Sequence, residues 1–118
     1  PTGDKVLKSL VSVAHTCLRE ADILGRLGGD EFAIILPQTD LNQAKSVGER
    51  LRQTIEATEI LEGDNTLPVR YTVSLGVSEV RLGNEMIEQA VKRADTALYF
   101  AKRHSRNLVV TENEIVPA

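Results

Sequence analysis

The stretch RLGGDEFAIIL, residues 26–36, joins a short apolar segment to a longer apolar run through two adjacent glycines and two adjacent acids. Gly28 and Gly29 mark a tight turn, because glycine adopts the backbone conformations that tight turns require. The flanking runs at 23–27 and 32–36 have the length and composition of short strands. The stretch therefore predicts a β-hairpin with both acids at its tip.

The acids are Asp30 and Glu31, and at a hairpin tip both carboxylates can approach one site. Two close carboxylates repel each other unless a cation lies beside them, and Mg²⁺ (or Mn²⁺) suits hard oxygen ligands and phosphates. Gly28 and Gly29, without side chains, let a phosphate or ribose come close to the backbone. A Gly-Gly turn with solvated acids explains the same four residues, and taken alone they favour that simpler interpretation.

The totals describe one ordinary domain. The chain has 118 residues, 42% of them hydrophobic and 3% aromatic, so Leu, Ile, Val and Ala must form the core. The formal charge of −3 argues against a partner that is a nucleic acid or an anionic membrane. The single cysteine, Cys17, cannot form an internal disulfide and is expected to be a buried thiol. No apolar run is long enough to span a membrane, and no signal peptide is visible.

Apolar residues at three- and four-residue steps predict helices at 5–21, 41–57 and 85–104. Asp4 is expected to cap the first helix at its N-terminus. Asp40, with a glutamine three residues later, resembles a capping box at the start of the second.

Between and after these helices we expect a loop at 59–68, a strand at 69–80, a short strand at 108–110 and a tail at 111–118. Gly76 within the long strand predicts a bulge or a close approach of another backbone. The order α-β-β-α-β-α-β predicts an α/β (α+β) fold, in which a mostly antiparallel sheet is flanked by helices.

A second charged cluster lies in RADTALYFAKRHSRN, residues 93–107. Lys102 and Arg106 are four apart and share a face if the helix continues that far. An ammonium and a planar guanidinium both suit phosphate oxygens. Basic residues in a last helical turn also complement the helix dipole, which explains the pair when it is taken alone. Together with the paired acids, the pair describes a triphosphate site for metal-assisted phosphoryl or nucleotidyl transfer.

These residues resemble a known family. GGDEF at 28–32 resembles the signature of the GGDEF domain, the diguanylate cyclase family. RLGGDEFAIILP at 26–37, TVSLGVS at 72–78, RADTALYFAKRHSRN at 93–107 and TGDKVL at 2–7 resemble further segments of that family. The resemblance covers nearly the whole chain at consistent spacing.

The resemblance implies a fold like the palm of nucleotidyl cyclases and polymerases. It implies that two GTP molecules condense to cyclic di-GMP with loss of two pyrophosphates. Each domain would bind one GTP, so catalysis would need a homodimer whose domains face each other. It further implies an upstream sensory domain, no nucleic-acid partner, and a place in the cytoplasm, either free or as the cytoplasmic part of a membrane-anchored sensor.

Roles follow from the resemblance by position. Asp30 and Glu31 would share metal binding and deprotonation of the attacking 3′-hydroxyl, and the two roles are not assigned separately. Asp4 would accept hydrogen bonds from the guanine edge, alongside or instead of capping its helix. The expected GTP-binding residues are Asp4, Gly28, Gly29, Lys102 and Arg106.

READ, residues 19–22, resembles the RxxD site at which the family's product binds and inhibits the enzyme. Arg19 would reach guanine or phosphate, and Asp22 would accept from guanine N1 and N2. An ordinary ion pair between residues three apart at a helix end is the alternative explanation.

The chain also departs from the family pattern. Two helices, a central strand with a further metal-binding aspartate, and an asparagine that reads guanine would precede Pro1. The chain starts PTGDKVL without a methionine. We therefore expect a piece of a longer protein: a GGDEF domain over 1–110 that is incomplete at its N-terminus, followed by a tail at 111–118, and inactive by itself. Ser105 replaces the family's usual glycine, which is expected to shift Arg106 slightly.

Three interpretations remain at this point. The first is a catalytic diguanylate cyclase domain, which the intact motif at 28–32 favours because regulatory versions often lose part of it. The second is a non-catalytic GGDEF module that binds GTP or cyclic di-GMP for regulation. The third, a purely structural dimerisation module, is disfavoured by the two intact charge clusters.

Overall fold

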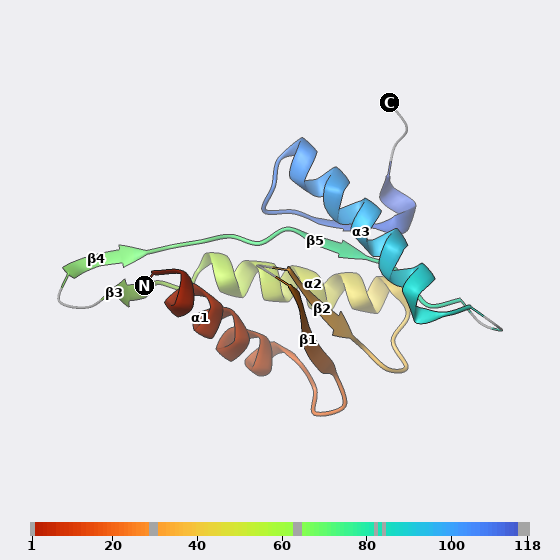
Figure 1. The fold of residues 1–118 in the computed structure, drawn as a ribbon, viewed down its shortest axis with the longest axis horizontal. Coiled ribbons are helices and arrows are strands. Elements are labelled where there is room, and N and C mark those ends of the chain that lie inside the picture. Colours follow the sequence, from red (N-terminus) through yellow and green to blue (C-terminus); the bar gives the residue numbers. More distant parts are fainter. Residues whose placement is uncertain (1, 29–30, 63–64, 82, 84, 116–118) are drawn as a thin grey trace.

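The structure is a computed structural model that describes residues 2–28, 31–62, 65–81, 83 and 85–115 (Figure 1). Over these described residues, three helices and six short strands follow one another, with a short 3-10 helix, η1, near the C-terminus. In chain order the elements are α1 (Thr2–Cys17), β1 (Ile23–Gly28), β2 (Glu31–Ile35), α2 (Leu41–Glu56), β3 (Ile60–Glu62), β4 (Asn65–Val69), β5 (Leu75–Val77), α3 (Ile87–His104), β6 (Val109–Thr111) and η1 (Glu112–Glu114).

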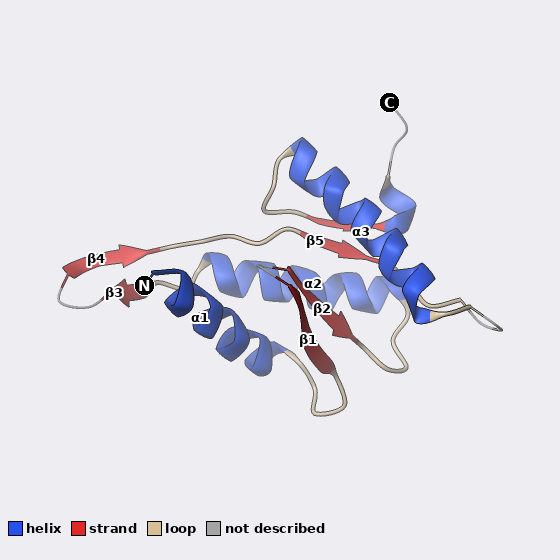
Figure 2. Cartoon of the chain, viewed as in Figure 1, coloured by secondary structure: helices blue, strands red, loops and turns tan. Residues whose placement is uncertain are grey.

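The strands pair two by two. β1–β2 and β3–β4 are antiparallel hairpins, whereas β5 and β6, from distant parts of the chain, are parallel. Within the described residues no ladder joins these three pairs into one sheet. Helices and strands alternate along the chain and pack on one another (Figure 2), which confirms the predicted α+β class.

Two apolar clusters hold the elements together. In the first, α1 and α2 bury Ala14, Cys17, Leu51 and Ile55 against one face of the β1–β2 hairpin and the segment that leads into β5. In the second, the inner face of α3 packs on β6; its buried members are Ala97, Ala101 and Val110. The expectation that Cys17 is a buried free thiol is confirmed.

The molecule is elongated, with extents of 53 × 37 × 24 Å. Its radius of gyration is 15.0 Å, compared with roughly 13.5 Å for a compact domain of this length. Figure 1 shows the reason: the β3–β4 hairpin lies at one end of the long axis, far from α3. None of the described helices combines the length and apolar character that a membrane span requires.

The first helix differs from the prediction at both ends. It begins at Thr2, so the backbone of Asp4 lies inside the helix and the N-cap prediction for that residue is wrong. It ends at Cys17 rather than at residue 21. The cause is a local turn in which the Arg19 N–H donates to Asp22 Oδ2 at 2.7 Å and the Asp22 N–H donates to the Arg19 carbonyl at 3.0 Å.

Two predictions in the second half of the chain are wrong. The loop expected at 59–68 contains most of the β3–β4 hairpin, whose turn residues had indicated irregular structure. The long strand expected at 69–80 is interrupted, because β4 ends at Val69 and β5 covers only Leu75–Val77.

The start of the expected tail is structured. Thr111 ends β6 and is only 5% exposed, and η1 follows it directly. Lys45 of α2 reaches Glu114 of η1 at 2.5 Å. Because this contact joins residues 69 positions apart in the chain, no local sequence pattern could indicate the element.

Candidate functional site

The β1–β2 hairpin carries Glu31, one of the two predicted acids, as expected. Its register pairs Ile23 with Ile35 and Gly28 with Glu31, with an irregularity between Arg26 and Gly28. Glu31 is the first residue of β2 and is exposed. Gly29 and Asp30 lie outside the described residues. The hairpin prediction is therefore confirmed, and of the two acids only Glu31 is placed.

Gly28 has a backbone conformation that favours glycine. Its φ of +154° is one that residues with side chains rarely adopt. A Cβ built on Gly28 would meet no described atom within 4 Å. Among the described residues, the backbone at this point is thus open on the side where a larger residue would project, and the approach of a phosphate or ribose stays a prediction.

The basic pair is arranged differently from the prediction. Lys102 lies exposed in the last turn of α3, but the helix ends at His104, before Arg106. Arg106 and Asn107 have φ angles of +55° and +46°, in the left-handed region. Lys102 and Arg106 therefore do not share a helical face, because the chain reverses after Ser105.

Ser105 does not take the left-handed conformation itself. Its φ is −155°, and the left-handed residues are the two that follow. The turn is closed by the Ala101 carbonyl, which accepts from the N–H of Ser105 at 3.2 Å and of Arg106 at 2.9 Å. Among the described residues, no hydrogen bond or ion pair joins Glu31 to Lys102 or Arg106.

The metal prediction involves Asp30, which lies outside the described residues, so it stays a prediction. Those residues contain no group of three or more His, Cys, Asp or Glu side chains that could hold a metal ion. Glu31 offers one exposed carboxylate of the hard-oxygen type that Mg²⁺ prefers. The side chain of Asp4 is also outside what the structure describes, so its guanine-reading role stays a prediction.

Arg19 and Asp22 form a close ion pair at the end of α1. Arg19 Nη2 lies 2.9 Å from Asp22 Oδ1, and the carboxylate side chain is 2% exposed while that of Arg19 is 58% exposed. The same Nη2 donates to the Pro37 carbonyl and to Thr39 Oγ1, each at 2.9 Å. Hydrogen bonds from Arg19 hold the pKa of Asp22 below its usual value, and those to Asp22 raise the pKa of Arg19.

A surface hollow adjoins this ion pair. Its lining residues are His15, Leu18, Arg19, Glu20, Asp22 and Leu24. The ion pair between residues three apart, which the sequence analysis gave as the alternative explanation, is present. Both of its residues line this hollow.

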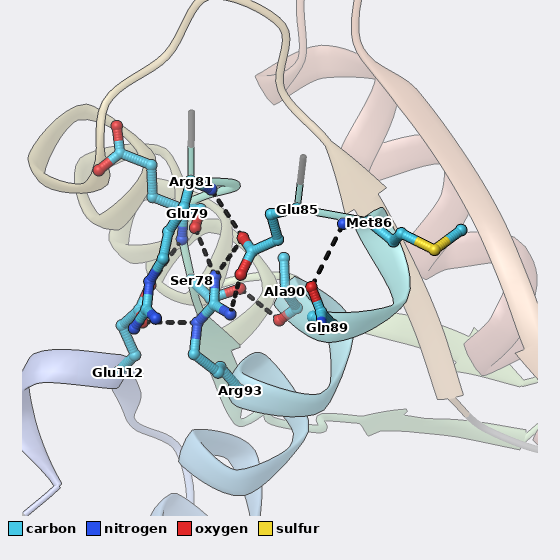
Figure 3. A network of polar contacts seen from close by, with 9 residues as sticks. All are labelled: Ser78, Glu79, Arg81, Glu85, Met86, Gln89, Ala90, Arg93 and Glu112. Atoms are coloured by element: carbon cyan, nitrogen blue, oxygen red, sulfur yellow. Dashed lines mark hydrogen bonds and ion pairs between the residues drawn. The ribbon is translucent and has the colours of Figure 1, made fainter. Parts of the chain in front are cut away.

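Sequence patterns missed two polar networks. In one, Arg93 of α3 binds Glu85 and Glu112, as Figure 3 shows. In the other, Arg52 of α2 contacts Asn107 after α3, 55 residues further along the chain. Neither has a local signal, because the partners come together only when the elements pack.

Known proteins match the chain over most of its length. The family model described as "Diguanylate cyclase, GGDEF domain" matches residues 1–108. Diguanylate cyclase DgcM of Escherichia coli K12 is 42% identical over 108 residues, which are 92% of this chain and 25% of that protein. Diguanylate cyclase A of Treponema denticola is 36% identical over 115 residues, which are 98% of this chain and 30% of that protein.

Solved structures of diguanylate cyclases are also similar to this chain. Diguanylate cyclase SiaD of Pseudomonas aeruginosa, in complex with its activator SiaC, has a TM-score of 0.84 at 42% identity, over 92% of this chain and 41% of that one. The GGDEF domain of DgcB from Caulobacter crescentus, in complex with c-di-GMP, has a TM-score of 0.84 at 28% identity, over 95% of this chain and 66% of that one.

These likenesses confirm the α+β, palm-like fold class. The chain spans 25% to 30% of the length of the two curated relatives. The family-model match covers the hairpin with Gly28 and Glu31, the turn with Arg106, and every element between them. The chain therefore belongs to the GGDEF domain family, the family of the diguanylate cyclases.

Proposed function

We propose that the chain is the GTP-condensing part of a diguanylate cyclase. The 3′-hydroxyl of each GTP attacks the α-phosphorus of the other, which forms a P–O3′ bond and breaks the bond to the β-phosphate. Two such steps give cyclic di-GMP and two pyrophosphates. The observation that carries the proposal is the intact Gly28–Phe32 motif on the β1–β2 hairpin, with Gly28 in an open glycine conformation and the Glu31 carboxylate exposed.

The predicted residues of the β1–β2 hairpin and of the end of α3 divide the tasks of this reaction. Glu31, together with Asp30, would hold Mg²⁺ (or Mn²⁺) and accept the proton of the attacking 3′-hydroxyl. The ion, when bound, would offset the charge of the phosphates and polarise the α-phosphorus. The open backbone at Gly28 lets the triphosphate come close, and Lys102 and Arg106 bind its oxygens.

The reaction needs two active sites that face each other, because each nucleotide supplies one hydroxyl and one α-phosphorus. We infer a homodimer for catalysis and an upstream sensory domain that sets the arrangement of the two copies. SiaD is a relative whose solved structure contains an activator protein, so control of such a domain by another protein has a precedent.

We further infer that the product inhibits the enzyme at Arg19 and Asp22. The exposed Arg19 guanidinium suits a phosphate or the guanine O6 and N7 edge, and Asp22 suits guanine N1 and N2. Because Arg19 already occupies both oxygens of a buried Asp22 carboxylate, the ligand would meet Arg19 first. The adjoining hollow leaves room for a base beside it.

The central test is product formation by the full-length protein from GTP and Mg²⁺, followed by chromatographic separation. Glu31→Gln keeps the shape of the side chain and removes its charge, and we expect product formation to fall at least about 100-fold. The control Glu88→Gln changes an exposed glutamate on α3 and should leave the rate unchanged. Wild-type protein that binds GTP without converting it would instead support the regulatory module.

Inhibition is tested by calorimetry with cyclic di-GMP. Arg19→Ala should bind the product at least about tenfold more weakly than wild type, because a charge-assisted contact is lost. The control Thr39→Val removes one of the bonds that hold Arg19 but keeps the guanidinium, so binding should persist. Equal affinities of wild type and Arg19→Ala would refute the inhibitory site.

A further inference from the structure

The turn after α3 holds two successive left-handed residues without a glycine. Arg106, at φ +55°, is of a type that rarely adopts this conformation, whereas Asn107, at +46°, tolerates it. Such backbone persists only where the surroundings hold it in place. The contacts that hold Arg106, the residue expected to bind phosphate, therefore matter for the site.

The side chain of Asn107 is held from α2 at both of its polar ends. Arg52 Nη1 donates to Asn107 Oδ1 at 3.1 Å. Asn107 Nδ2 in turn donates to Glu56 Oε2, one helical turn further along α2. The two contacts fix the amide against the face of α2, so the residue next to Arg106 cannot rotate without breaking both.

Arg52 is itself held in place. Its side chain is 16% exposed, its Nη2 lies 3.1 Å from Glu49 Oε2, and its Nη1 lies 3.9 Å from Glu56 Oε2. A planar guanidinium between two carboxylates of the same helix has a defined orientation. Arg52 thus presents one N–H to Asn107 from a fixed position.

The turn is also anchored on its other sides. The Arg106 N–H donates to the Ala101 carbonyl at 2.9 Å, which ties it to α3. The Leu108 carbonyl accepts from the Leu75 N–H at 2.9 Å, where β6 begins its pairing with β5. The backbone of Arg106 is therefore held between α3 and the fixed Asn107, while its side chain is exposed.

We propose that Arg52, through its bond to Asn107, is a positioning residue that directs the Arg106 guanidinium toward the phosphates of GTP. The proposal rests on the phosphate-binding role given to Arg106 above. Arg52 does not touch the nucleotide in this scheme. Its contribution is to fix the backbone that carries the flexible Arg106 side chain. The Arg106 side chain then loses less conformational freedom when the nucleotide binds, which lowers the entropic cost of binding.

A purely structural role for Arg52 makes a different prediction. If Arg52 only stabilises the contact between α2 and the turn, its loss harms nucleotide binding by the same factor whether or not Arg106 is present. If it acts through Arg106, its loss has no further effect once the guanidinium is gone. A double-mutant cycle separates the two cases.

The test uses the full-length protein, Mg²⁺ and 3′-deoxy-GTP, which lacks the attacking hydroxyl and so binds without reacting. Arg52→Gln should weaken the binding of 3′-deoxy-GTP about tenfold in calorimetry, because the charge-assisted contact of Arg106 with the phosphates becomes ineffective. In an Arg106→Ala background, Arg52→Gln should change the affinity by less than about twofold. The control Arg70→Gln removes an exposed arginine paired with Glu59 and should bind as wild type does.

A second variant covers the case in which Arg52→Gln does not fold. Asn107→Gly removes the acceptor for Arg52, while glycine still adopts the left-handed backbone, so it should also weaken binding. An unchanged affinity in Arg52→Gln or in Asn107→Gly, or the same loss with and without Arg106, would overturn the positioning role. If wild type does not bind 3′-deoxy-GTP at all, the proposed function fails and this inference fails with it.

Discussion

At the scale of single residues, Gly76 shows how closely the backbone elements approach one another. A Cβ at this position would lie 1.9 Å from the Ala94 carbonyl oxygen and 2.5 Å from the Leu98 backbone nitrogen, both in α3. The neighbours are helix backbone, which cannot move aside as the end of a flexible side chain can. The close approach that the sequence predicted at Gly76 is thus confirmed, and it seats α3 on β5.

Gly76→Ala should therefore be severely destabilising. The added methyl group forces α3 away from β5, and we expect a loss of about 3 kcal/mol or more in the free energy of unfolding. Urea titration followed by circular dichroism measures the loss. Gly25→Ala is the matched control, because a Cβ there meets no described atom within 4 Å. Similar stabilities of the two variants would contradict the packing argument.

At the scale of elements, α2 contacts both the first apolar cluster and the turn after α3. Its buried residues Leu51 and Ile55 join the first apolar cluster, and its Arg52 contacts the turn after α3. The helix begins with a capping box: the Gln43 N–H donates to Asp40 Oδ1 at 2.8 Å, and the Asp40 N–H donates to Gln43 Oε1 at 3.1 Å. Two N–H groups that the helix start leaves unpaired are satisfied in this way.

Asp40→Ala should cost about 1 kcal/mol in the free energy of unfolding, because the N-terminal turn of α2 loses its side-chain acceptor. Thermal denaturation of the variant and of wild type measures the cost. Asn42→Ala, two residues into the same helix and exposed, serves as control and should change stability much less. A loss in Asn42→Ala as large as that in Asp40→Ala would show that the capping box is not responsible.

The helices and hairpins also show which parts of the fold could be predicted from the sequence. The prediction for α2, 41–57, agrees with the observed Leu41–Glu56 because a capping signal and an apolar stripe coincide. The β1–β2 hairpin was predicted for a similar reason, since its turn and both strands are adjacent in the chain. The β3–β4 hairpin was missed because its strands carry Pro68 and a run of turn-forming residues.

Contacts between segments that are distant in the sequence could not be predicted from local patterns. The parallel pairing of β5 with β6 joins residues more than 30 positions apart, and no local pattern specifies it. The position of Arg106 also depends on a contact between segments that are distant in the sequence. Its spacing from Lys102 predicted a shared helical face, but the helix ends first, and Asn107 is held by α2 instead.

At the scale of the whole molecule, one arginine connects the C-terminal segment to the rest. Arg93 Nη1 and Nη2 bind the two oxygens of Glu85 at 2.6 and 2.7 Å, and Nε binds Glu112 Oε1 at 2.8 Å (Figure 3). Nη2 also donates to the Glu79 carbonyl at 2.8 Å. The loop before α3, α3 itself and η1 thus meet at one guanidinium, which makes the segment after β6 part of the folded unit.

This network predicts how stability depends on acid. Hydrogen bonds from Arg93, and then from the Arg81 N–H, lower the pKa of Glu85 from 4.5 to about 2. A carboxyl whose pKa is lower in the folded state stabilises the fold above its unfolded pKa, and this contribution is lost as the pH falls from about 4.5 to about 2. Glu85→Gln removes the titrating group and keeps the shape of the side chain.

The melting temperature of wild type should therefore exceed that of Glu85→Gln at pH 7, and the difference should shrink on acidification and nearly vanish by about pH 2. Arg93→Gln should also lose acid-dependent stability, because the hydrogen bonds from Arg93 are the largest cause of the lowered pKa of Glu85. Acid effects of groups outside this network are common to the proteins and cancel in the differences. A gap between wild type and Glu85→Gln that stays constant from pH 7 to pH 2 would show that the ion pair between Arg93 and Glu85 does not contribute to folding.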